Sequence, residues 1–193
     1  MTLTAEQERR LVSNIKKWAR ILDESAHALS SNDISKLFRE YDFSNLTPDQ
    51  FRQVRSSVFS LPADAHMVAI SLRQIDEYAR ELEGSSLWSG GIAHAGTTFR
   101  SLLASEEARN LRDVVEHGAE YVAGRGRRPE LVQDPDADWP SVLIIDGKVI
   151  RITVFGLSYE VKPLILAAIE FVRVLPSGNA GESASKTPNA APA

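Results

Sequence analysis

Arg112 and His117 are the two side chains in this sequence whose types and spacing best suit chemistry on a phosphate. A guanidinium keeps its positive charge at any physiological pH, and its fork of donors fits a phosphate group. An imidazole can take up or release a proton near neutral pH. The two groups are therefore sufficient parts for RNA cleavage without a metal ion. No other arginine in the sequence has a histidine five positions after it.

We expect both residues on one helix from about Phe99 to Ala123. At about 100° per residue, one stripe of this helix is apolar and should be buried: Leu111, Val114, Val115, Ala119 and Val122. The opposite arc is polar and carries Arg109, Arg112, Asp113, Glu116, His117 and Glu120. On this helical wheel Arg112 and His117 lie about 140° apart, one at each flank of the polar arc. A second copy of the helix packed there would bring two arginines and two histidines together across one seam.

The same polar residues also have a purely structural interpretation. Arg112 and Glu116 are four positions apart, and so are Asp113 and His117. Pairs at this spacing form surface ion pairs on helices, each worth only tenths of a kcal/mol. A solvated charged face of this kind needs no catalytic role.

An Arg-x4-His motif with Asp113 directly after the arginine, near two long helices joined by a loop, resembles the signature of the HEPN superfamily. The resemblance covers mainly residues 62–126. It implies an all-helical homodimer in which a composite ribonuclease site forms between two protomers. In toxin members a tyrosine often stands two residues after the histidine, whereas Tyr121 stands four residues after His117 here.

The resemblance also implies a role for each residue of the motif. His117 would deprotonate the ribose 2′-hydroxyl or protonate the leaving oxygen, Arg112 would stabilise the charged phosphorane, and Asp113 would orient the site. No metal and no cofactor would be needed. The implied activity is that of an endoribonuclease, of the toxin or defence type, that acts on RNA phosphodiesters.

Further arginines near the motif are candidates for contacts with the RNA backbone. Arg109 lies on the polar arc, and Arg125, Arg127 and Arg128 follow the predicted helix closely. Closely spaced guanidiniums raise the local positive potential and could guide a phosphate backbone toward the site. Such a cluster is also typical of a solvated loop, here balanced by the acidic residues Asp134, Asp136 and Asp138.

The remaining pattern predicts a mainly α fold, a helical bundle with up-and-down helices. Expected helices, besides the one from Phe99, cover Thr4–Leu29, Ile34–Tyr41, Thr47–Leu61, Pro62–Gly84 and Pro163–Leu175. The glycine-rich residues 84–98 are expected to form a loop that holds Trp88, and residues 124–141 a turn-rich connector. Alternating residues predict a small antiparallel hairpin, Ser141–Ile145 with Val149–Phe155, and a short third strand at Ser158–Val161.

This pattern divides the chain into three parts. Residues 1–61 form an N-terminal helical region, 62–175 a HEPN-like core with the hairpin and the last helix, and 176–193 a tail whose small polar composition predicts disorder.

Composition narrows the classes of function. The formal net charge of −4 argues against a general nucleic-acid coat but permits a local basic patch. The chain has no cysteine, no apolar run of membrane-spanning length and no signal-peptide pattern, so we expect a cytoplasmic protein without membrane insertion. No histidine spacing typical of a metal site, no P-loop and no GxSxG motif is present.

A non-catalytic function remains the alternative. Much of the sequence is helix without any further chemical motif, as in a scaffold that binds other proteins. The amphipathic N-terminal helix, with its stripe of Leu11, Ile15 and Trp18, or the edge of the hairpin would then contact a protein partner.

Overall fold

A computed structural model describes residues 3–31, 47–134, 136, 141–145 and 148–177. Three sequence predictions therefore lie outside the described residues. They are the short helix at Ile34–Tyr41, the turn between the two strands of the hairpin, and most of the tail.

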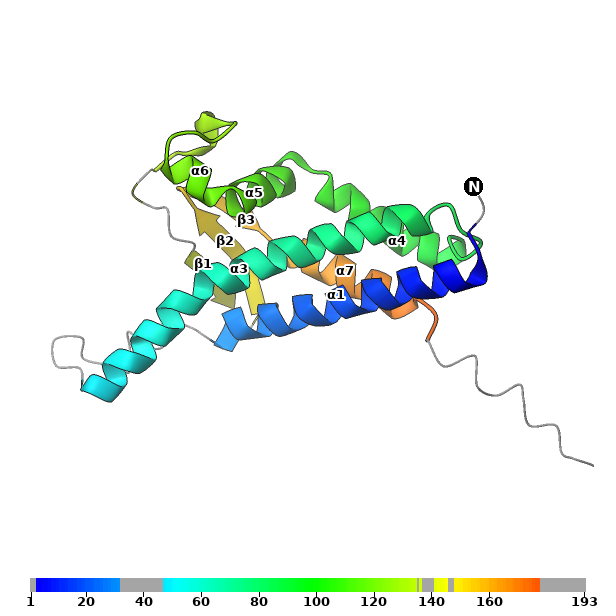
Figure 1. The fold of residues 1–193 in the computed structure, drawn as a ribbon, viewed down its shortest axis with the longest axis horizontal. Coiled ribbons are helices and arrows are strands. Elements are labelled where there is room, and N and C mark those ends of the chain that lie inside the picture. Colours follow the sequence, from blue (N-terminus) through cyan, green and yellow to red (C-terminus); the bar gives the residue numbers. More distant parts are fainter. Residues whose placement is uncertain (1–2, 32–46, 135, 137–140, 146–147, 178–193) are drawn as a thin grey trace, which may run out of the picture.

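Two long helices, α1 (Ala5–Ser31) and α3 (Pro48–Leu82), form the frame of the molecule (Figure 1). Both begin as predicted, and Thr47 caps α3 by accepting the N–H of Gln50 while the Gln50 side chain accepts the N–H of Thr47. The prediction of two helices meeting at Pro62 is wrong, because α3 runs through that residue without interruption. A proline removes one backbone hydrogen bond, but that loss does not end a helix whose remaining turns are held by packing.

The two helices lie antiparallel and bury their facing sides. Ile15, Leu22 and Leu29 of α1 are fully buried, as are Ile75 and Leu82 of α3. Near the start of α1, the Glu8 carboxylate accepts hydrogen bonds from the backbone and hydroxyl of Ser86, just beyond the end of α3. The predicted amphipathic stripe of the N-terminal helix is thus used inside the chain, since Leu11 and Trp18 also pack against this core.

Helix α4 (Gly90–Leu103) occupies much of the predicted glycine-rich loop, so the prediction of a loop over residues 90–98 is wrong. Glycines weaken a helix in isolation, yet here they permit close packing. Gly96 faces the Trp88 ring, which meets Phe171 of α7 (Lys162–Val174) edge-on at 5.8 Å. The Phe99 ring lies nearly parallel to that of Phe171, with the two ring centroids 6.2 Å apart. Trp88 therefore anchors the segment between α3 and α4 against α7.

The helix predicted from Phe99 to Ala123 is three separate helices. After α4 ends, Ser105 caps α5 (Glu106–Glu116) by accepting the N–H of Ala108 at 3.2 Å. A break at His117 separates α5 from the short α6 (Gly118–Val122). A 3-10 turn at Pro129–Leu131 then lies in the connector.

A three-stranded antiparallel sheet in the order β1-β2-β3 follows, as β1 (Ser141–Ile145), β2 (Lys148–Val154) and β3 (Leu157–Glu160). The β2–β3 turn consists of Phe155 and Gly156, both with positive φ, 52° and 78°. Two consecutive positive φ values fit the right-handed twist of a two-residue hairpin. Phe155 accepts this unusual conformation while it is almost completely buried.

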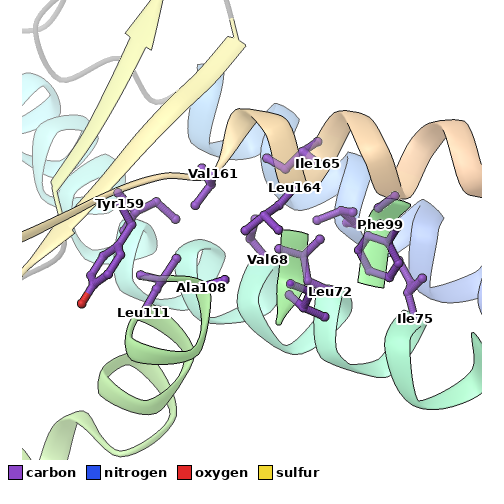
Figure 2. Close-up of a cluster of buried hydrophobic side chains, with 14 of the residues drawn as sticks. Val68, Leu72, Ile75, Phe99, Ala108, Leu111, Tyr159, Val161, Leu164 and Ile165 are labelled. Carbon is purple, nitrogen blue, oxygen red and sulfur yellow. The ribbon is translucent and has the colours of Figure 1, made fainter. Parts of the chain in front are cut away.

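The core joins the long helices to strands β2 and β3 and confirms the predicted fold class, mainly helical with a small sheet and a final helix. Figure 2 shows Val68 and Leu72 of α3, Phe99 of α4, and Leu164 and Ile165 of α7 converging on one cluster. Ala108 and Leu111 of α5 extend the cluster toward Tyr159 of β3 (Figure 2). The inner face of α5 is therefore fixed against the sheet and the bundle.

A pair of glycines in α4 tests this packing. In Gly96→Ala the new Cβ would lie 2.3 Å from the Trp88 ring, so we expect a loss of about 1–3 kcal/mol in the free energy of unfolding. In Gly91→Ala the Cβ meets nothing within 4 Å, so we expect a gain of up to about 1 kcal/mol. Urea denaturation measures both, and equal effects of the two substitutions would contradict the nesting of Trp88 against Gly96.

Candidate functional site

The predicted site residues lie at the corner between α5 and α6. Leu111 and Val114 turn inward from α5 and are buried, which fixes the opposite side of the helix toward the surface. The last turn of α5 is also held from α3, because His66 Nδ1 lies 3.2 Å from the carbonyl oxygen of Val115. The ends of helices leave carbonyls without helical partners, and this contact satisfies one of them.

His117 is the residue at which the chain turns. It ends α5 with φ −114° and ψ 22°, and its N–H donates to the carbonyl of Asp113 at 3.0 Å. Its own carbonyl accepts the N–H of Glu120 at 2.8 Å. Because the N–H of His117 still makes the helical bond to Asp113, the chain leaves the axis of α5 only after His117.

The His117 imidazole is partly exposed and has a carboxylate beside it. Its Nδ1 lies 3.4 Å from Glu120 Oε1, and 35% of the side chain is accessible. A carboxylate at this distance attracts the imidazole in its protonated form. The sequence analysis placed Glu120 on the polar arc but did not pair it with His117. The spacing of three residues is the one sequence signal that could have suggested this contact.

Asp113 is engaged by Tyr121 of α6. The Tyr121 hydroxyl donates a hydrogen bond to Asp113 Oδ2. Tyr121 is buried, with its ring 6.1 Å from that of Phe155 and directly beneath Gly126. Burial, and next the bond to Asp113, raise the pKa of Tyr121 to about 12. The carboxylate predicted to orient the site thus joins α6 to α5.

The predicted buried stripe is correct only within α5. Ala119 is exposed and Val122 is 61% accessible, so the prediction that both are buried is wrong. The break at His117 rotates α6 relative to α5 and turns Tyr121 inward in their place.

Three of the four arginines proposed to contact RNA are exposed: Arg109, Arg125 and Arg127. The N–H of Arg125 donates to the carbonyl of Glu120 at 2.8 Å, which holds the start of the connector against the end of α6. Arg112 itself is partly buried. None of these four guanidiniums forms an ion pair within 4 Å of a carboxylate elsewhere in the described chain.

Arg128 differs from these arginines because its guanidinium is occupied. It donates to the side-chain oxygen of Asn110 and to Glu130 at 3.1 Å, and it lies 3.7 Å from Glu106. These contacts fasten the connector to the outer side of α5. Sequence spacing could not reveal them, since Asn110 and Arg128 lie eighteen residues apart.

The corner thus combines an imidazole that has a carboxylate 3.4 Å away with guanidiniums, on α5 and in the connector, that form no ion pair with a described carboxylate. This set can exchange a proton at His117 and can attract a phosphate through Arg112 and the exposed arginines. Within the residues that the structure describes, no three His, Asp or Glu side chains lie close enough together to hold a metal ion.

Comparison with protein-family models, with curated proteins and with solved structures found no match. Of the helices in the described residues, none has both the length and the apolar character needed to cross a lipid bilayer.

Two tyrosines provide a test of the corner's construction. Tyr121→Phe removes the hydroxyl that binds Asp113, and we expect it to lower the free energy of unfolding by about 1–3 kcal/mol. Tyr159→Phe removes a buried hydroxyl without a partner in the described structure, so it should be neutral or stabilising. Urea denaturation distinguishes them, and a larger loss in Tyr159→Phe would contradict this assignment.

The same tyrosines predict a dependence of stability on alkaline pH. Burial raises the pKa of both Tyr121 and Tyr159 from 10 to about 12. A raised pKa in the folded state means that the stabilising contribution is complete below pH 10 and disappears as pH rises toward about 12. Ultraviolet titration of the folded protein should show two late-ionising phenols, and either Phe substitution should remove one of them. Ionisation of both below pH 10 in folded protein would overturn the prediction.

Proposed function

We propose that the α5–α6 corner is a metal-independent, HEPN-like endoribonuclease site shared by two copies of the chain. One observation carries the proposal: the partly exposed His117 imidazole has Glu120 Oε1 3.4 Å from its Nδ1, at the end of the helix that carries Arg112. The Arg112 guanidinium forms no ion pair with a carboxylate that the structure describes. An imidazole and a guanidinium that reach the same phosphodiester are the minimum set for cleaving it by acid–base catalysis.

The proposed reaction uses the substrate's own 2′-hydroxyl as the nucleophile. In the proposed first step, the unprotonated Nε2 of His117 accepts the 2′-hydroxyl proton, while Glu120 Oε1 lies 3.4 Å from Nδ1 of the same ring. The 2′-oxygen bonds to phosphorus, and the bond from phosphorus to the 5′-oxygen breaks. His117 of the second copy, in its protonated form, gives its proton to the leaving 5′-oxygen. The products are a 2′,3′-cyclic phosphate and a free 5′-hydroxyl.

Arg112 supports the charge that develops during this reaction. The phosphorane carries more negative charge on its oxygens than the starting phosphodiester, and a guanidinium stabilises that difference. Arg109, Arg125 and Arg127 would hold the flanking phosphates, because each is exposed and without an acidic partner in the described chain. This local charge is compatible with the overall net charge of −4.

A second copy is needed because one corner offers one histidine. Cleavage needs a base for one oxygen and an acid for the other, and a two-fold axis beside α5 would supply both from identical residues. In the alternative function, a protein-binding scaffold, the N-terminal stripe is not free to contact a partner, since Leu11, Ile15 and Trp18 pack inside the molecule.

RNA cleavage in EDTA tests the proposal. Purified protein should cut single-stranded RNA and leave cyclic phosphate ends, detected by resistance of the 3′ end to phosphatase. His117→Ala should lower the rate about 100-fold or more, because it removes the proton-transferring group. Arg112→Ala should lower it to a similar degree through loss of charge stabilisation.

The matched control is His94→Ala, which removes an exposed histidine from α4 and should leave cleavage unchanged. Circular dichroism must show that each variant is folded. Intact RNA over a broad range of substrates and protein concentrations would contradict the proposal, as would equal activity of His117→Ala and wild type.

A further inference from the structure

A groove of about 220 Å³ lies between the last turns of α1 and the first turns of α7, on a surface that the proposed nuclease site does not use. Figure 1 shows α1 and α7 side by side. The lining side chains come from these two helices and from the start of β2: Asp23, Ala26, His27, Ser30, Lys148, Lys162, Ile165, Leu166 and Ile169.

The floor of the groove is apolar and open to solvent. Leu166 is 50% accessible and Ile169 is 40% accessible. The other apolar side of α7 already packs in the core through Leu164, Ala168 and Phe171, so Leu166 and Ile169 form an additional apolar edge. Large apolar side chains gathered at a concave surface are typical of a binding site for another protein.

The charge beside this floor is mainly positive. Lys148 and Lys162 line the groove, and neither forms an ion pair with another described residue. Among the described residues of the lining, Asp23 is the one carboxylate. The groove therefore complements an apolar surface that is bordered by acidic residues.

The shape of the groove follows from the direction of the two helices. Lys16 near the middle of α1 donates to the carbonyl of Pro176 beyond the end of α7, whereas Ala26 and His27 lie by the start of α7. The helices are thus antiparallel, and the space between two such helices accepts a third helix by ridges-into-grooves packing.

We propose that this groove binds an amphipathic helix of a partner protein, with Leu or Ile at i, i+3 and i+7 and with Glu or Asp along the borders. The apolar positions of that helix would cover Leu166 and Ile169, and its carboxylates would pair with Lys148 and Lys162. This site is independent of the ribonuclease proposal, because it shares no residue with the α5–α6 corner. It relocates the protein-binding surface from the N-terminal stripe to the seam between α1 and α7.

A pair of synthetic helical peptides tests the inference on the full chain. Both carry the same leucine pattern, one with glutamates on its polar face and the other with lysines. Titrated into ¹⁵N-labelled protein, the glutamate peptide should shift the amide signals of Ala26, Leu166 and Ile169 and bind at least tenfold more tightly than the lysine peptide. Rising salt should weaken the glutamate peptide's binding.

Matched variants assign the effect to the groove. Lys148→Glu with Lys162→Glu should reverse the peptide preference, and Leu166→Asp should weaken binding at least tenfold. Val122→Asp is the control: it makes the same kind of change at an exposed apolar residue of α6, outside the groove, and should leave peptide binding unchanged. Equal binding of the two peptides, shifts confined to other surfaces, or no shifts would overturn the inference. Binding of phosphatidylserine vesicles without binding of the glutamate peptide would also overturn it, in favour of a membrane surface.

Discussion

The burial of Tyr121 is the constraint on which the geometry of the candidate site depends. Its hydroxyl binds Asp113 of α5, its ring packs beside Phe155 in the β2–β3 turn, and Gly126 of the connector lies directly against it. A buried phenol needs a hydrogen-bond partner, and Asp113 supplies one. One side chain therefore joins helix, sheet and connector, and it fixes the direction in which the chain leaves His117.

The rest of the surface at this corner follows from that arrangement. With Tyr121 turned inward, Glu120 lies beside the His117 imidazole, and the connector returns over α6 with Arg125 and Arg127 exposed. The Phe155 carbonyl accepts the N–H groups of Gln133 and Asp134, which attaches the far end of the connector to the hairpin turn. Contacts with α5 at one end and with the hairpin turn at the other therefore hold the segment that follows His117. Proton transfer requires such fixed positions of the reacting groups.

Local signals predicted the elements that depend on local physics. The spacing of Ile15, Leu22 and Leu29 predicted α1, Thr47-Pro48 predicted the start of α3, and Pro163 predicted the start of α7. The sequence did not predict helix α4 because glycines lower helix propensity. The close contact of Gly96 with the Trp88 ring depends on tertiary packing, which the local pattern does not show. The break at His117 was missed because a helical wheel assumes continuity, although Gly118 directly follows it. The hydrogen bonds of Asp113 with Tyr121 and of Arg128 with Asn110 could not be predicted, because helical periodicity does not encode such contacts.

The central claim is that two copies meet along the outer side of α5, and a single cysteine tests it most directly because the chain has none of its own. Arg109→Cys places a thiol on that side, and Thr97→Cys places one on the exposed side of α4. Mild oxidation followed by a non-reducing gel should give a covalent dimer with Arg109→Cys and leave Thr97→Cys monomeric. A monomeric Arg109→Cys at concentrations where RNA is cleaved, or equal cross-linking of both variants, would contradict the shared site.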